Sequence, residues 1–249
     1  MTPRCRYVLR LADTNLVLAQ RLGEWVGHAP ALEEDLGLAN LALDLLGQAR
    51  LLLAHAGALE GRGRGEDELA YLREESEYLN LTLVEQPNGD FGDTIVRQFL
   101  FDAWQAPLYA GLAQCRDAAL AAIAAKAARE AAYHLRYSAG WLERLGDGTV
   151  ESHARVARSL AALWPFTQEL FADDDVDRAA AAEGMGLLPS TLEPAWSARV
   201  DATLGSARLA RPQPAPFGWY GKQGRHSEHL GYLLAEMQSL HRAHPGATW

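Results

Sequence analysis

The sequence predicts an all-α protein, a four-helix bundle followed by additional C-terminal helices and an extended arm. Three observations support this prediction. Alanine and leucine dominate a hydrophobic content of 49%, whereas valine, isoleucine and threonine, which favour strands, are sparse. Long stretches of the chain repeat apolar residues at helical spacing. No strand-like alternation and no internal repeat of about 20–50 residues competes with that pattern.

The four longest helical patterns define the predicted bundle, at residues 7–26, 31–59, 91–114 and 117–145. The first ends at the Gly and Pro of residues 27–30. The acidic turn 33–35 complements the helix dipole at the start of the second. A Pro-Asn-Gly-Asp turn at 87–90 leads into the third, and the glycines of 146–148 end the fourth.

Shorter elements account for the rest of the chain. Helices are expected at 66–79, 150–171, 190–209 and 227–241. Pro165 interrupts the second of these, while Ser190 and Glu193 form a capping box at the start of the third. Residues 211–224, rich in proline, glycine and aromatic residues, predict the arm. The chain is therefore expected to be a single domain over 1–249, with the core bundle at about 7–145 and the C-terminal helices and arm at about 150–249.

Composition and charge restrict the classes of function. The net charge is −9 and the isoelectric point is near 5.4, which argues against nucleic-acid binding. Two cysteines, Cys5 and Cys115, provide neither a disulfide framework nor a metal spacing. The first residues lack an apolar signal core, and no run of 18 apolar residues occurs. A cytoplasmic protein without membrane contact is expected.

One segment comes close to a metal-binding motif. A bundle that binds two irons takes a carboxylate from each of two helices and a Glu-x-x-His motif from each of the other two. His134 lies in the fourth predicted bundle helix, but the position three residues before it is Ala131, which cannot ligate a metal. Asp102 is flanked by apolar residues in the third bundle helix. An acid in such surroundings is either buried with a partner or part of a site.

Several sequence runs carry a resemblance to a known family, and they extend over nearly the whole chain. They lie at residues 33–36, 47–50, 84–91, 94–100, 144–149 and 229–237. On these runs the chain resembles the structural (C) subunits of bacterial phenylacetyl-CoA 1,2-epoxidase complexes, also called phenylacetate-CoA oxygenases. The resemblance implies a ferritin-like four-helix bundle related to the catalytic di-iron subunit of the same complex.

The resemblance also allows the iron-binding positions of the catalytic relative to be carried over. Its Asp-Glu-Ala-Gly-His run corresponds to residues 44–48 here, so that a glutamate becomes Leu45 and a histidine becomes Gln48. In the fourth bundle helix the second glutamate becomes Ala131, while the histidine is kept as His134. The third-helix aspartate falls on Asp102, and the first-helix glutamate falls on Asn15. With two of six ligands kept, the resemblance implies a degenerate di-iron site that holds no metal, and no catalytic or cofactor-binding residue.

The implied function is that of a non-catalytic structural subunit in aerobic phenylacetate degradation. The complex inserts one oxygen atom of dioxygen into the ring of phenylacetyl-CoA, with electrons from NADPH. The expected partners are the homologous di-iron catalytic subunit, a further small subunit and a reductase. Self-association and a contact with coenzyme A stay open, the latter through a locally basic tail that contains Arg208, Arg211, Lys222 and Arg225.

Two other interpretations compete with this one. A di-iron oxygenase in its own right could use the shifted ligand set Asp44, Asp102, Glu130 and His134, because i,i+4 spacing also places side chains on one face. This set lacks a second histidine, and each shift turns a carboxylate by about 100° around the helix axis. In the structural alternative for the same residues, Glu130 pairs with a nearby Arg or Lys, and Asp102 and His134 hydrogen-bond each other. A regulatory or storage-type bundle without an oxygenase partner is the third interpretation.

Overall fold

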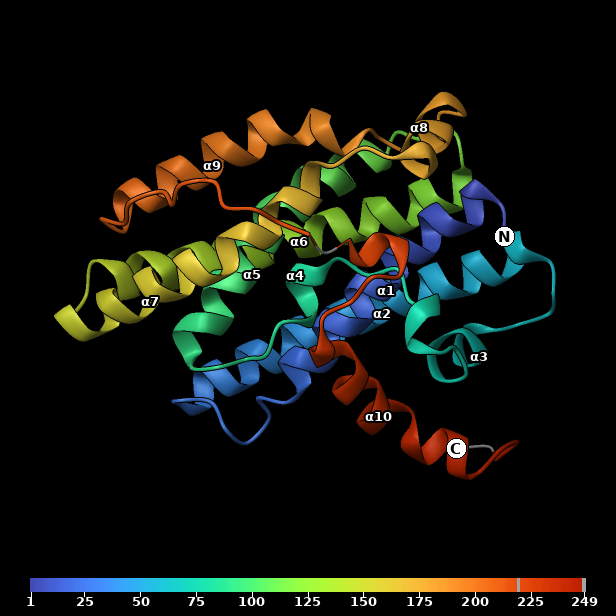
Figure 1. Cartoon of the computed structure of the whole chain (residues 1–249), viewed down its shortest axis with the longest axis horizontal. Helices are drawn as coiled ribbons and strands as arrows, with labels where there is room; N and C mark the ends of the chain where they lie inside the picture. Colours follow the sequence, from blue (N-terminus) through green and yellow to red (C-terminus); the bar gives the residue numbers. More distant parts are fainter. Residues whose placement is uncertain (219, 248–249) are drawn as a thin grey trace. The chain divides into compact units, whose positions relative to one another are not determined.

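The computed structural model describes residues 1–218 and 220–247, and it contains no strand within them. The all-α class is therefore confirmed. The chain groups into two compact units (Figure 1). Unit 1 contains Met1–Pro87 and the described C-terminal segment 220–247, and unit 2 contains Asn88–Gly218. The single-domain organisation over 1–249 stays a prediction.

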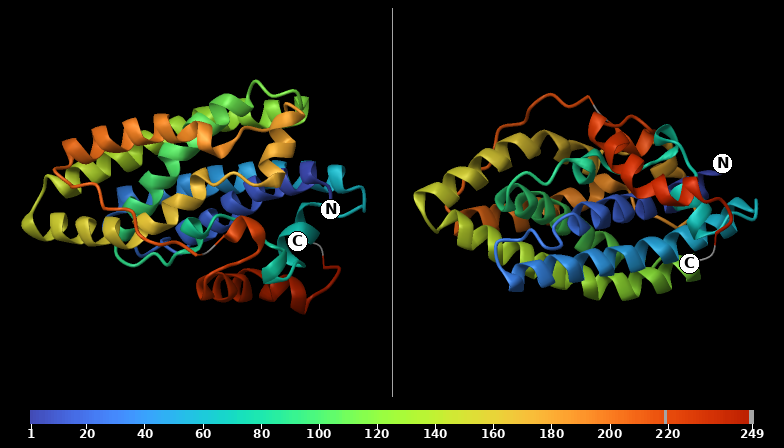
Figure 2. Two further views of the ribbon diagram at one scale, coloured as in Figure 1. Left: turned by 45° about the horizontal axis from the view of Figure 1, so that its top comes forward. Right: turned by 90° about the horizontal axis from the view of Figure 1, so that it is seen from below.

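Unit 1 is built on two long antiparallel helices that lie side by side, α1 (Pro3–Gly23) and α2 (Leu32–Glu60) (Figure 2). Helix α1 starts earlier than residue 7, because the Thr2 hydroxyl accepts a hydrogen bond from the Cys5 amide at 3.3 Å and proline suits the first helical turn. Helix α2 ends at Gly61, whose φ of 68° is in the left-handed region.

By length and hydropathy alone, α2 could cross a membrane, and 44% of its most apolar window is buried. The core helix of a helical bundle passes the same test, because one of its faces is buried against its neighbours. In unit 1 that neighbour is α1. The absence of membrane contact stays a prediction.

Short elements complete unit 1: α3 (Glu66–Tyr71), η1 (Glu75–Glu77), α4 (Thr82–Glu85), η4 (Gly221–Gln223) and α10 (Glu228–Ala243). The helix expected over 66–79 ends at Tyr71, so that prediction was too long. The backbone beyond it binds buried polar side chains instead, as where the Leu79 amide donates to Asp13 at 2.8 Å. Helix α10 packs against α1, α3 and η1.

Unit 2 repeats the long antiparallel pair with α5 (Phe91–Leu112) and α6 (Ala118–Gly146) (Figure 2). A capping box starts α5, because Asp90 accepts from the Asp93 amide at 3.1 Å and Asp93 accepts from the Asp90 amide at 2.9 Å. Helix α7 (Val150–Leu163) ends just before Pro165, and a 3₁₀ segment, η2 (Trp164–Phe171), continues it. The interruption predicted at Pro165 is therefore confirmed.

The remaining elements of unit 2 are α8 (Asp175–Ala182), η3 (Pro189–Leu192) and α9 (Glu193–Ser206). The predicted capping box of Ser190 and Glu193 is wrong: the Ser190 hydroxyl donates to Asp173 at 2.6 Å, and α9 begins only at Glu193. The end of α6 packs closely on the residue that follows α9. A Cβ atom on Gly146 would lie 2.4 Å from the Ala207 carbonyl oxygen. Residues 209–218 have no regular structure, as expected for an arm.

Candidate functional site

Asp102 is the best-defined polar group at the positions carried over from a di-iron centre. It lies on α5 and is completely buried. One carboxylate oxygen accepts a hydrogen bond from the Gln98 amide at 2.7 Å, and the other accepts from the Ser138 hydroxyl on α6, also at 2.7 Å. The hydrogen bond expected between Asp102 and His134 is thus replaced by bonds to these two side chains.

The environment of Asp102 is unfavourable for a charged carboxylate. Burial raises the pKa of Asp102 to about 6 from its ordinary value of 3.8. The charge of His134 and the hydrogen bonds from Ser138 and Gln98 act in the opposite direction. Because burial outweighs these contributions, the neutral acid is favoured until the solution is only slightly acidic.

His134 and Ala131 lie one turn apart on the buried side of α6. Ala131 places a methyl group where a ligating carboxylate would be required. His134 is near enough to Asp102 for its charge to influence the carboxyl group. These three positions therefore meet within unit 2 and keep two groups able to ligate a metal.

The other three carried-over positions belong to unit 1. Asn15 is buried on α1, and Leu45 and Gln48 are buried one turn apart on α2. None of the three supplies a carboxylate or an imidazole, the ligands that a di-iron centre of this kind uses. The sequence prediction that these side chains point into the protein is confirmed by their burial.

The residues present do not fit a di-iron centre. Within residues 1–218 and 220–247, no group of three or more His, Cys, Asp and Glu side chains is arranged to hold a metal ion. The shifted ligand set has no geometric support. Glu130 forms an ion pair with Lys126 at 3.5 Å, as the structural alternative predicted, and Asp44 is half-buried on α2 in unit 1.

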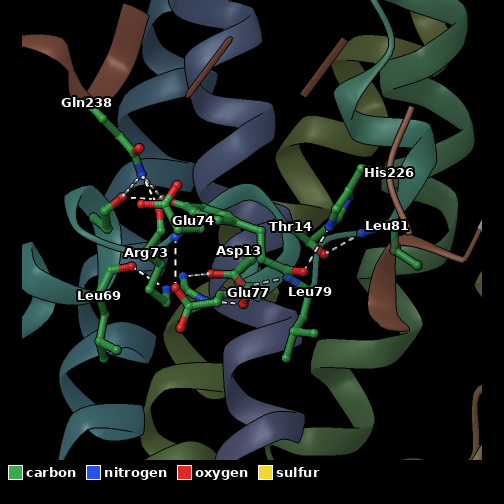
Figure 3. Close-up of polar contacts among 12 residues, drawn as sticks. Asp13, Thr14, Leu69, Arg73, Glu74, Glu77, Leu79, Leu81, His226 and Gln238 are labelled. Carbon is green, nitrogen blue, oxygen red and sulfur yellow. Dashed lines mark hydrogen bonds and ion pairs between the residues drawn. The ribbon is translucent and has the colours of Figure 1, made fainter. Parts of the chain in front are cut away.

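Unit 1 contains a buried ion pair that the sequence analysis missed (Figure 3). The guanidinium of Arg73 faces the carboxylate of Asp13, with Nη1 at 3.0 Å from Oδ2 and a second, shorter contact between Nη2 and Oδ1. Neither side chain is exposed at all. Arg73 also donates to the carbonyls of Leu69 and Glu77, and it stacks over the Tyr78 ring at 4.3 Å. The run Asp13-Thr14-Asn15 inside an apolar helix was the only signal of this cluster in the sequence.

A second buried cluster joins the C-terminal segment to the rest of unit 1. The His226 Nδ1 lies 2.9 Å from Glu85, and its Nε2 lies 2.9 Å from the Tyr78 carbonyl oxygen. Glu85 also accepts from the Ser227 amide at 2.6 Å and from Asn80 at 2.9 Å. The expectation that residues 226–229 form an exposed helix cap is wrong for His226, whose side chain is 1% exposed.

The basic tail is engaged within the chain. Arg208 pairs with Asp147 at 2.8 Å and Arg211 with Asp201 at 2.7 Å, while Lys222 is buried. Three of the four cations proposed to reach coenzyme A are thus committed elsewhere. Among the arm aromatics that were weighed as interface anchors, Phe217 packs on Phe166 with ring centres 5.7 Å apart. Trp219 lies outside the residues that the structure describes.

Comparison with known proteins identifies relatives over the full length. The family model described as "Phenylacetic acid catabolic protein" matches residues 1–249. A relative from Escherichia coli (strain K12), named as the C component of 1,2-phenylacetyl-CoA epoxidase, is 54% identical over 243 residues. The alignment covers 98% of each chain.

Proposed function

Because this chain belongs to the phenylacetic acid catabolic protein family, we propose that it is a non-catalytic structural subunit of a phenylacetyl-CoA ring-epoxidising monooxygenase. One observation carries the non-catalytic part of the proposal. Four of the six carried-over positions, Asn15, Leu45, Gln48 and Ala131, hold side chains that supply neither a carboxylate nor an imidazole. The geometry around Asp102, with both oxygens bound by protein groups, supports the same conclusion.

The proposed reaction takes place in a partner. A homologous subunit with complete Glu-x-x-His motifs would hold the two irons, and a reductase would deliver electrons from NADPH. This chain would bury one face of that partner and hold its helices in place. Retention of the bundle after loss of the ligands fits a protein maintained for its packing surface.

The chain's own residues support a rigid packing role. The Asp13–Arg73 pair connects α1 to the segment after α3, and the Glu85–His226 pair connects α4 to the C-terminal segment. Arg21 on α1 adds bonds to the carbonyls of Glu85 at 2.8 Å and His229 at 3.0 Å. Such bonds fix irregular segments against the long helices. Assembly with a further small subunit, self-association, a coenzyme A contact and a cytoplasmic location complete the proposal.

Reconstitution tests this function. The di-iron subunit, the reductase and the small subunit are assayed for oxidation of phenylacetyl-CoA with and without this chain. The proposal predicts that turnover is lost without it, and that the chain alone has none in the presence of the reductase. Full turnover without the chain would contradict the proposal, while failure to associate with the di-iron subunit would favour the regulatory or storage-type bundle.

A further inference from the structure

Helix α2 is apolar on two faces. Its buried face packs against α1 through residues spaced three and four apart, namely Leu38, Leu41, Leu45, Gln48, Ala49, Leu52, Leu53 and Ala56. The opposite face also carries leucines, and this is why the helix is apolar enough to resemble a membrane span. A surface helix of a soluble protein ordinarily has a polar outer face. The outer face of α2 therefore needs an explanation.

Four exposed leucines form a ridge along this outer face. Leu32, Leu36, Leu43 and Leu51 are 71%, 57%, 64% and 44% exposed, and they are separated by four, seven and eight residues. These spacings place them on one side of an α-helix. We call these four residues the leucine ridge. Scattered single apolar residues on a surface are ordinary, whereas a contiguous row of them marks an interaction site.

Small residues beside the ridge leave room for side chains of a partner. Gly47 lies on the same face, and no atom lies within 4 Å of the place where its Cβ would be. Ala54 is also exposed there. Large side chains that alternate with gaps are the ridges and grooves through which two helices pack. The chemistry of the face therefore fits another helix.

The charges around the ridge decide which helix it accepts. The first turn of α2 carries Glu33, Glu34 and Asp35, and Asp44 lies beside Leu43 near the middle of the helix. The nearby cation, Arg50, is paired with Glu66 at 2.7 Å. An anionic lipid surface would be repelled by these acids. An antiparallel second copy would bring the two Asp44 side chains close together, so self-association here is also disfavoured.

We propose that the leucine ridge is the surface on which a different helical subunit of the assembly docks, through an apolar helix flanked by Lys and Arg side chains. The proposal rests on the proposed function and names the surface that this function uses. Its size is adequate for the centre of an interface. At about 1.5 Å per residue, α2 is about 43 Å long, and a strip about 10 Å wide covers about 400 Å², half of the roughly 800 Å² that each partner buries in a standard complex. Val26, which is 59% exposed just before α2, lies in position to extend it.

The test measures affinity of the full chain for the di-iron subunit of the same organism. The double variant Leu36→Glu/Leu43→Glu introduces two charges on the ridge, and Val150→Glu on α7 is the matched control, because Val150 is 91% exposed in unit 2. The double variant is expected to bind about 100-fold more weakly than wild type. Val150→Glu is expected to bind as wild type does. Both variants should melt within a few degrees of wild type, because the substituted side chains are exposed.

The other outcomes separate the docking surface from the function. If wild type binds the di-iron subunit and the double variant binds equally well, the ridge is not the docking surface, although the proposed function stands. If wild type does not bind at all, the proposed function fails first. If the double variant instead abolishes a dimer of this chain, or binding to anionic vesicles, the proposed occupant is wrong. Leu36→Ala/Leu43→Ala, which keeps helix propensity high, should weaken binding in the same direction if the double variant does not fold.

Discussion

The buried pair of Asp13 and Arg73 gives a stability prediction that can be worked from the structure. Asp13→Asn preserves the size of the side chain and one acceptor oxygen but removes its charge. The guanidinium of Arg73, which is not exposed at all, would then be buried without a counter-charge. Breaking a buried pair in this way costs about 3–5 kcal/mol. For a chain of this length, that loss lowers the melting temperature by about 10 °C.

The assay is thermal unfolding followed by circular dichroism, with two reference variants. Arg178→Ala breaks a surface pair with Asp175, whose side chains are 57% and 99% exposed, and it should leave the melting temperature unchanged. Asp13→Leu combined with Arg73→Met replaces the pair by apolar side chains and should recover most of the lost stability. An Asp13→Asn variant that melts within about 2 °C of wild type would refute the reasoning.

Other buried groups give three more predictions. Glu85→Gln should destabilise the chain by about 2–4 kcal/mol and increase hydrogen exchange in residues 220–247, since His226 loses its acidic partner; unchanged exchange would contradict this. Because burial raises the pKa of Asp102 to about 6, its contribution to stability is complete below about pH 4 and is lost as the pH rises through 6. Asp102→Asn should therefore gain stability relative to wild type between about pH 5 and 8, by up to about 3 kcal/mol, in denaturant titrations. Gly57→Ala should lose about 1–3 kcal/mol, because its Cβ would lie 2.2 Å from the Arg64 carbonyl oxygen, whereas Gly47→Ala in the same helix should not be destabilised.

The helical architecture was largely predictable because its signals are local. Periodic leucines and alanines, the 87–90 turn and the position of Pro165 each determine structure within a few residues. The ferritin-like all-α class is confirmed by the helices and by the family match. Errors occurred where a tertiary contact outweighs a local preference. Ser190 bonds to Asp173 rather than capping α9, and the backbone after Tyr71 binds Asp13 and Arg73 rather than continuing a helix.

The candidate site was predictable in part. A family resemblance assigns each ligand position one by one, and the burial of these positions agrees with that assignment. The partners of the buried charges could not be predicted, because Asp13 lies 60 residues from Arg73 and Glu85 lies 141 residues from His226. Neither separation leaves a periodic trace in the sequence. The same limit explains why Asp102 was paired with His134 rather than with Gln98 and Ser138.

The central claim is that this chain supports an iron-containing partner without holding iron itself. The most direct test purifies the complex, separates the chains and measures iron in each, with Asp102→Ala and Glu130→Ala variants of this chain alongside. The account predicts that iron stays with the homologous subunit, that this chain carries only traces, and that the two variants leave the traces unchanged. Iron near two atoms per chain in this subunit, reduced by either substitution, would contradict it.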